Sequence, residues 1–357
     1  MRILIAAPTF GVYGGIEVFV MTLADWLRKQ TAHQVRICFK VVADCAVTPA
    51  LAQRCADLGL AHRFVRRGSR GLLADIRWSE LVHGNTCSPD IALFARLSGR
   101  PLVLTVHNWC RGTRGIRHRL WYLCNRSADW RTYNSRFVLE SWEPGGQRPG
   151  SELIPTVSML PQRPTPLQDR RGFFFISRLV DNKGVDVLVK AYASARLDRG
   201  QWPLTIAGVG PMGQWAREYI GARGIVGIDL PGFLAEEEKA RRMAGARWLV
   251  APANTCEDMG LTPIEARNVG VPAIVTRDGG LPEAAGPAAL LCSRGDVGEL
   301  AALLERAAEM SAEEYGERAA LAKESLRGYL RPLSDYVAIY ERVAASRRRL
   351  VPGRTTA

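Results

Sequence analysis

The sequence lacks the features that would place it in a special structural class. None of its apolar runs reaches the ~18 residues of a membrane span, so we do not expect the chain to cross a bilayer. The apolar stretch 1–8 is too short for a signal peptide and leads into a glycine-rich turn, which favours a first buried strand. The eight cysteines form no C-x-x-C pair, which argues against a zinc site or a disulfide framework and favours reduced thiols in a cytoplasmic protein.

Acidic residues are also scarce in one half of the chain. The 357 residues carry 48 lysines and arginines against 35 aspartates and glutamates, a net charge of +13. Residues 1–170 hold a net +11 of this charge, and residues 171–357 hold +2. The length suggests two domains, and an apolar content of 47% is ordinary for a packed globular protein. We therefore expect two halves that face different partners.

The basic residues of the first half form two segments. One contains Arg63, Arg66, Arg67 and Arg70, and the other contains Arg111, Arg114, Arg117 and Arg119. The second segment lies on a predicted amphipathic helix, in which Ile116, Leu120, Leu123 and Cys124 share one side. Three interpretations remain open: a solvated helix face, docking on an anionic membrane surface, or binding of a phosphorylated acceptor. Because no nucleic-acid-binding motif accompanies the charge, we expect no nucleic acid partner.

Short β-rich runs alternate with helical patterns along both halves. In the first half we predict strands at 2–7, 34–42, 80–84, 102–107 and 130–134, and helices at 15–29, 49–58, 89–98, 115–126 and 135–142. In the second half we predict strands at 173–177, 203–207, 227–230, 247–251 and 272–276, and helices at 184–196, 211–222, 235–244, 263–269, 297–309, 312–325 and 333–348. Prolines and glycines crowd residues 144–172, which predicts irregular chain between two domains. The fold class is thus α/β, with two doubly wound parallel-sheet domains facing a central cleft.

Three glycine-containing segments follow predicted strands and are candidates for binding phosphate. Gly14 and Gly15 precede a helix, whose N-terminus offers free N–H groups to an anion; the alternative is a tight turn. Arg178 and Lys183 flank a second loop and suit a diphosphate, although a solvated loop is the simpler interpretation. The segment Gly208–Gly213 matches G-x-G-x-x-G, with Asp229 about 20 residues later.

The glycine pattern at 208–213 does not by itself specify a nicotinamide cofactor. It lies well inside its domain rather than after the first strand, and Pro211 stiffens the turn. A phosphate or a base edge resting on Gly208 and Gly210 is as plausible as NAD.

Two glutamates and a histidine complete the candidate residues. Glu257 lies on a predicted loop after the strand 247–251, and Glu265 follows Thr262-Pro263 in the pattern of a helix capping box. One carboxylate for sugar hydroxyls and one for ribose hydroxyls is a consistent division, with charge-assisted bonds of ~1.5–3 kcal/mol each. His107 closes a first-domain strand and is either a structural residue or a substrate contact.

Taken together, these motifs resemble the family 4 retaining glycosyltransferases of the GT-B fold. The resemblance is densest in residues 173–285, where Gly260-Leu261-Thr262-Pro263-Ile264-Glu265 and Gly279-Gly280-Leu281-Pro282-Glu283 match the family pattern. It implies an acceptor-binding domain at 1–165, a donor-binding domain at 166–330, and a C-terminal helix at 331–357 that packs back toward the first domain. Asp258-Met259 departs from the family pattern and leaves the donor sugar open.

The resemblance also implies a role for each candidate residue. Glu257 and His107 would contact the donor sugar, Glu265 would bind the nucleotide ribose, and Arg178 and Lys183 would hold the diphosphate. The remaining donor contacts would come from Gly14, Gly15, Gly208, Gly210, Met259, Gly260 and Leu261. The implied reaction is retaining hexosyl transfer from UDP- or GDP-hexose to a cell-surface glycan or lipid-linked acceptor, with no covalent enzyme intermediate. The absence of a D-x-D triplet fits a reaction without a required metal or cofactor.

The expected location is cytoplasmic, with peripheral contact at the inner membrane. Two alternatives remain: an NAD-dependent oxidoreductase that uses Gly208–Gly213, and a non-catalytic basic protein that binds membranes or nucleic acid.

Overall fold

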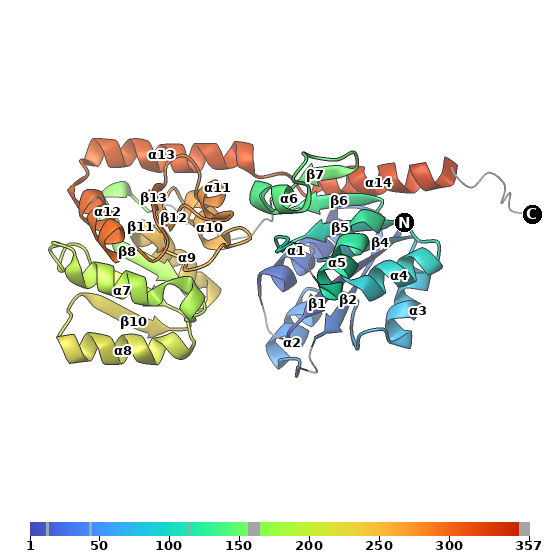
Figure 1. Cartoon of the computed structure of the whole chain (residues 1–357), viewed down its shortest axis with the longest axis horizontal. Coiled ribbons are helices and arrows are strands. Elements are labelled where there is room, and N and C mark those ends of the chain that lie inside the picture. Colours follow the sequence, from blue (N-terminus) through green and yellow to red (C-terminus); the bar gives the residue numbers. More distant parts are fainter. Residues whose placement is uncertain (12–13, 43–44, 113–114, 156–164, 350–357) are drawn as a thin grey trace, which may run out of the picture. The chain divides into compact units, whose positions relative to one another are not determined.

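The computed structural model of the chain describes residues 1–11, 14–42, 45–112, 115–155 and 165–349 (Figure 1). The chain divides into two compact units. Unit 1 combines Met1–Val157 with Arg331–Ala357, and unit 2 spans Ser158–Leu330. Each unit is described by itself below.

Unit 1 contains a seven-stranded parallel sheet. Its strands are β1 (Arg2–Thr9), β2 (Gln34–Val41), β3 (His62–Val65), β4 (Leu81–Asn85), β5 (Leu102–Val106), β6 (Trp130–Tyr133) and β7 (Ser151–Leu153), in the order β3-β2-β1-β4-β5-β6-β7. Successive residues of β1 point to opposite faces, and both faces are buried: Leu4 packs into one apolar core and Ile5 into the other. Burial on both sides explains why this strand is an uninterrupted apolar run.

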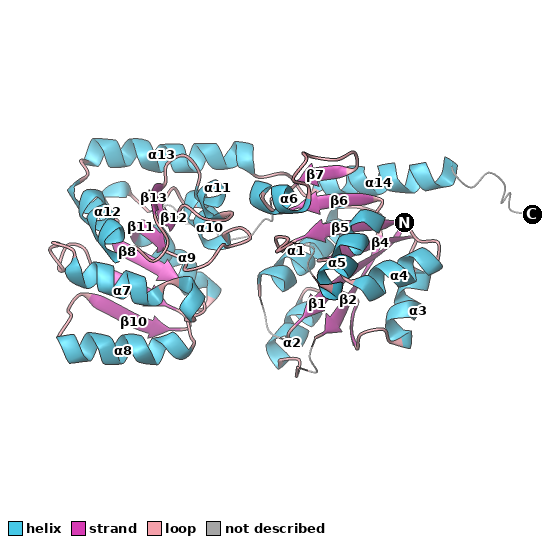
Figure 2. Ribbon diagram, viewed as in Figure 1, coloured by secondary structure: helices cyan, strands magenta, loops and turns pink. Residues whose placement is uncertain are grey.

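Helices cover both faces of this sheet. They are α1 (Gly15–Gln30), α2 (Pro49–Asp57), α3 (Arg70–Trp78), α4 (Pro89–Leu97), α5 (Ile116–Ser127), α6 (Arg136–Trp142) and α14 (Ser334–Arg349). The core on one side draws on α1, α2 and α14, and the core on the other side draws on α3–α6 (Figure 2). The last helix is an integral part of unit 1, because Tyr336, Ile339 and Tyr340 are buried in the same core as Phe19 of α1.

Unit 2 repeats this plan with six parallel strands. They are β8 (Arg171–Ile176), β9 (Leu204–Ala207), β10 (Ile228–Gly232), β11 (Ala246–Ala251), β12 (Ala273–Thr276) and β13 (Leu290–Cys292), in the order β10-β9-β8-β11-β12-β13. The strand order therefore reverses between β8 and β11, just as it does between β1 and β4 in unit 1. In open α/β sheets, ligands bind outside the carboxyl ends of the strands at such a switch point.

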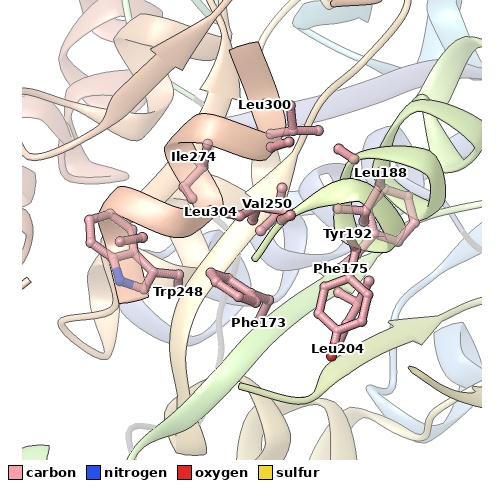
Figure 3. Close-up of a cluster of buried hydrophobic side chains, with 14 of the residues drawn as sticks. Phe173, Phe175, Leu188, Tyr192, Leu204, Trp248, Val250, Ile274, Leu300 and Leu304 are labelled. Atoms are coloured by element: carbon pink, nitrogen blue, oxygen red, sulfur yellow. The ribbon is translucent and has the colours of Figure 1, made fainter. Parts of the chain in front are cut away.

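The helices of unit 2 enclose two further cores. They are α7 (Val185–Ser194), α8 (Pro211–Arg223), α9 (Glu236–Gly245), α10 (Leu261–Asn268), α11 (Leu281–Ala285), α12 (Val297–Glu309) and α13 (Ala312–Tyr329), with 3₁₀ turns η1 (Leu167–Asp169) and η2 (Asp181–Lys183). Figure 3 shows the larger core, to which β8 contributes Phe173 and Phe175, β11 contributes Trp248 and α12 contributes Leu300. The second core packs α9, α10 and α11 on the other face.

The predicted pair of doubly wound parallel sheets is confirmed, and several local predictions are wrong. The interval 144–172 is not irregular throughout, because β7 lies within it and β8 begins at Arg171. The sequence analysis also missed β3, α3, α11 and β13.

Candidate functional site

The loops that follow β8 and β11 meet at the switch point of unit 2. Gly184 closes the first loop with φ +72°, and a β-carbon there would lie 1.8 Å from the carbonyl oxygen of Pro252 in the second loop. Only glycine permits this approach. The backbone N–H of Asn254 then donates to the carbonyl of Asn182 at 3.0 Å. The two loops are thus fastened together, and the side chains they carry share one edge of the sheet.

Lys183 and Glu257 form an ion pair across these loops. The Lys183 Nζ lies 2.6 Å from Glu257 Oε1, and each side chain is about one-fifth exposed. Arg178, on the same loop as Lys183, is exposed and makes no side-chain hydrogen bond or ion pair within the described parts of the chain. The structure therefore brings together Lys183 and Glu257, which are distant in sequence. The Arg178 side chain, on the same loop as Lys183, is left accessible.

A pair of glycines fixes the backbone around Glu257. The N–H of Gly280 donates to the carbonyl of Glu257 at 2.8 Å. A β-carbon at Gly279 would lie 2.4 Å from that same carbonyl oxygen, and one at Gly280 would lie 2.5 Å from the carbonyl oxygen of Asp258. The Gly-Gly step before α11 therefore serves close backbone packing that holds Glu257 in place.

The start of α10 differs from the sequence prediction. Gly260 is the N-cap residue, with no side-chain cap, and the helix begins at Leu261. The predicted capping box with Thr262 at the N-cap is wrong, because Pro263 occupies the third helical position rather than the first. The first-turn amides of Leu261 and Thr262 have no partner within an α-helix, so the helix start offers donors to an anion or a hydroxyl.

Met259 contributes little surface to this site. Its side chain is 6% exposed and packs with Ile264, Ala284 and Leu326. Little of this residue is therefore accessible to a ligand.

Glu265 is a buried carboxylate on α10 with a cationic partner that sequence reasoning missed. Lys239 of α9 places its Nζ 3.1 Å from Glu265 Oε1 and 3.4 Å from Glu236 Oε2. Burial alone would lower the pKa of Lys239, but the two carboxylates outweigh it and raise that pKa. Lys239 is therefore charged at neutral pH, and it orients the carboxylate of Glu265.

Arg267, two residues further along α10, anchors this helix. The buried guanidinium donates to the carbonyls of Ala284 in α11 and Ala322 in α13, and to the hydroxyl of Ser325. A β-carbon at Gly286 would lie 2.7 Å from its central carbon. Arg267 thus has a structural role.

The glycines of the Gly208–Gly213 loop pack against the loop that carries Arg178. Gly208 (φ +128°) and Gly210 (φ +149°) would place a β-carbon 1.8 Å from the carbonyl oxygen of Ser177 and 2.3 Å from that of Leu179. The loop follows β9, one strand away from the switch point. Asp229, the residue that would bind ribose in a dinucleotide fold, instead pairs with Arg242 at 2.6 Å. Protein packing accounts for the glycine spacing without a dinucleotide.

We expect Gly208→Ala to destabilise unit 2 by roughly 3 kcal/mol, because the β-carbon meets a backbone oxygen in a conformation unfavourable for alanine. Gly221→Ala, in the last turn of α8 where the side chain meets open space, is a matched control that should stabilise by roughly 0.5–1 kcal/mol. Urea denaturation of both variants measures the difference. Unchanged stability in Gly208→Ala would mean that this glycine serves a ligand rather than the fold.

Unit 1 presents its own candidate residues at the carboxyl edge of its sheet. Gly14 is the N-cap residue of α1, where no side chain caps the helix, and Gly15 is the first helical residue. His107, directly after β5, is 6% exposed and shares a 3.0 Å hydrogen bond between its Nε2 and Asn85 Oδ1 at the end of β4. Because the amide oxygen accepts, the ring proton lies on Nε2 and Nδ1 is left as an acceptor.

Burial keeps two histidines of unit 1 uncharged. It lowers the pKa of His107 to about 4 and that of His83 to about 3. His83 connects α14 to the sheet, with Nδ1 2.7 Å from the hydroxyl of Tyr340 and Nε2 2.6 Å from the hydroxyl of Thr105. In the unfolded chain each imidazole takes up a proton near pH 6.5. In the folded chain the same ring stays neutral until the pH is much lower.

We expect unit 1 to lose stability as the pH falls below about 6.5, because His83 and His107 then bind protons in the unfolded chain but not in the folded one. At about pH 5 each ring costs about 2 kcal/mol. In urea denaturation from pH 7.5 to 5, His83→Gln should reduce the pH-dependent loss by about 2 kcal/mol. His118→Gln, on α5 and away from His83 and His107, should leave the pH-dependent loss of stability unchanged. An equal change in both variants would contradict a special role of His83 in this pH dependence.

The arginines predicted for an acceptor or a membrane lie on and before α5. Arg111, Arg117 and Arg119 are exposed. Arg114 lies outside the described residues. No helix in the described ranges is long and apolar enough to cross a membrane.

Comparisons with known proteins find family matches in both halves of the chain. The sequence profile described as "Glycosyl transferases group 1" matches residues 161–325, and "Glycosyltransferase Family 4" matches residues 13–156. A search of curated protein sequences finds no match.

Several solved structures share the fold along the whole chain. HepE of Anabaena, crystallised with UDP and with UDP-glucose, superposes with a TM-score of 0.78 for the UDP complex at 18% identity, over 98% of this chain and all of that one. A glycosyltransferase of Rickettsia africae gives 0.78 at 16% identity, covering 96% and 98% of the two chains. The lipopolysaccharide outer core galactosyltransferase WaaB gives 0.69 at 15% identity, covering 97% and 99%. The predicted GT-B fold is confirmed.

Proposed function

Because this chain belongs to glycosyltransferase family 4, we propose that it transfers a hexose from UDP- or GDP-hexose to a cell-surface glycan or lipid-linked acceptor, with retention of configuration. The observation that carries the proposal is the Lys183–Glu257 pair at the switch point of unit 2. The UDP-glucose complex of HepE and the galactosyltransferase activity named for WaaB support a hexose donor.

Cationic groups of unit 2 bind the donor diphosphate in this proposal. The exposed Arg178 donates two parallel N–H groups to phosphate oxygens, and Lys183 exchanges its bond to Glu257 for one to phosphate. As the bond from the anomeric carbon to the phosphate oxygen breaks, its electron pair moves to the departing diphosphate. Negative charge therefore grows where Arg178 and Lys183 already lie, and such preorganised donors stabilise the transition state more than the ground state.

The carboxylates bind the neutral sugar rings. Glu257, released from Lys183, accepts hydrogen bonds from donor-sugar hydroxyls, and Glu265, held by Lys239, accepts them from the ribose. The amides at Gly260 and Leu261 donate to the sugar or the phosphate. Contacts from Gly208, Gly210 and the backbone of Met259, and from Gly14, Gly15 and His107 in unit 1, remain predictions.

The acceptor hydroxyl attacks on the face from which the diphosphate leaves. The new C–O bond forms as the old one breaks, and the hydroxyl proton passes to the departing phosphate. The enzyme forms no covalent intermediate, and we propose that no metal ion is needed because the cations of the protein neutralise the leaving group.

A panel of nucleotide sugars tests the proposal. We expect one UDP- or GDP-hexose to raise the melting temperature and to be hydrolysed slowly without acceptor, with the same rate in excess EDTA. NADH, the ligand of the oxidoreductase alternative, should neither stabilise the protein nor change its own fluorescence. Stabilisation by NADH without an effect of any nucleotide sugar would overturn the proposal.

A further inference from the structure

Three of the four apolar residues predicted to share one side of α5 face solvent, whereas the fourth, Cys124, is buried in the core of unit 1. Ile116, Leu120 and Leu123 recur at helical spacing and are 81%, 46% and 62% exposed. α4, which packs against α5, adds the exposed Leu93 and Leu97. A group of large apolar side chains left in water on neighbouring helices marks an interaction surface.

The charge around this surface has a single sign. Residues 91–128 contain seven arginines and neither aspartate nor glutamate. Of these arginines, Arg96, Arg117, Arg119 and Arg126 are exposed on α4 and α5. The guanidinium of Arg117 lies 4.5 Å from the centre of the Trp121 ring, and that of Arg111 lies 5.2 Å from the Trp109 ring. Arginines next to aromatic rings and exposed leucines are the composition of helices that lie in a membrane interface.

We propose that the surface formed by α5 and the exposed leucines of α4 docks on an anionic lipid bilayer, with Ile116, Leu120 and Leu123 inserted at the level of the headgroups. A second copy of the chain is a poor occupant, because a twofold contact through this surface would place arginine against arginine. A phosphorylated glycan in solution would engage the arginines and leave the apolar residues in water. The bilayer satisfies both sets at once.

Vesicle flotation of the full chain tests this inference. We expect binding to phosphatidylcholine vesicles in which about one lipid in three is phosphatidylglycerol, and little binding to pure phosphatidylcholine. The double variant Ile116→Glu, Leu123→Glu should bind about tenfold more weakly or worse, since two inserted side chains become anionic. Each of Arg117→Gln and Arg119→Gln should cost about fivefold on anionic vesicles.

Val226→Glu is the matched control, because Val226 is a 68% exposed apolar residue of unit 2. It should bind vesicles within about twofold of the unmodified chain. Both glutamate variants should keep the melting temperature and the slow donor hydrolysis, so loss of docking is distinguishable from failure of the proposed transferase activity.

Three results would overturn the inference. The first is no preference of the unmodified chain for anionic vesicles. The second is unchanged vesicle binding by the double glutamate variant, which would show that Ile116 and Leu123 do not insert and that only the arginines contact the vesicle. The third is full displacement from vesicles by free glycerol phosphate at the same phosphate concentration, which would identify a soluble phosphate site.

Discussion

Replacement of Lys183 by alanine is expected to lower kcat by ~10²–10³-fold, the effect of removing about 2.7–4 kcal/mol of preorganised stabilisation from a developing anion. The ammonium group of Lys183 lies 2.6 Å from Glu257 Oε1 before the donor binds. In the proposed reaction it then exchanges this contact for one with the negatively charged diphosphate. Because the side chains of both partners are about one-fifth exposed, the free energy of unfolding should change by less than about 1 kcal/mol. Initial rates at saturating donor measure the effect.

Lys190→Ala is the matched control for this variant. Lys190 lies on α7 of the same unit and pairs with Asp186 at 3.2 Å, but it is not part of the proposed site. Its kcat should stay within about twofold of the unmodified chain. Equal losses of kcat in the two variants, or an unchanged kcat in Lys183→Ala, would show that Lys183 does not stabilise the departing diphosphate.

Glu257→Ala should have opposite effects on activity and on product binding. We expect kcat/KM to fall by about 10- to 150-fold, the equivalent of a charged hydrogen bond of ~1.5–3 kcal/mol to the donor sugar. The free nucleoside diphosphate should bind as tightly as before or more tightly, because Lys183 no longer has to leave a carboxylate. Steady-state kinetics and calorimetric titration with UDP or GDP separate the two effects.

Glu305→Ala serves as the comparison, since Glu305 forms an ion pair with Arg196 elsewhere in unit 2. It should change neither quantity. If Glu257→Ala weakened nucleoside diphosphate binding as strongly as it weakened catalysis, Glu257 would serve to place Lys183 rather than to bind the sugar.

The strands and helices of this chain could be predicted where the pattern is long and unambiguous. β1 is a continuous apolar run, and α1 and α12 carry clear helical spacing. β7 and β13 are only three residues long, too short for any periodicity to appear. The prolines and glycines of residues 144–172 predict irregular chain and mask the short strand β7.

The proximity of Lys183 and Glu257 was predictable because the strands of a parallel sheet end at a common edge. Lys183 and Glu257 lie 74 residues apart, yet each follows a buried strand, and adjacent parallel strands end at the same edge. Lys239 could not be found this way. The residues around Lys239 do not indicate that this side chain of α9 reaches Glu265 of α10. The contact between the two appears only in the folded unit.

Two other features depended on tertiary packing. α10 starts at Leu261 rather than after Thr262, and a β-carbon at its N-cap Gly260 would lie 2.7 Å from the Leu281 side chain; this close packing has no mark in the local sequence. The spacing of Ile116, Leu120, Leu123 and Cys124 correctly predicts a helix. Only Cys124 lies in the core, because spacing alone does not determine which residues meet the sheet and which meet the solvent.

A structure with UDP or GDP bound tests the central claim most directly. The account predicts diphosphate oxygens within hydrogen-bonding distance of both the Arg178 guanidinium and the Lys183 ammonium, with the Lys183–Glu257 contact broken and Glu265 on the ribose. A nucleotide whose phosphates rest on Gly208–Gly213, away from Arg178 and Lys183, would contradict it.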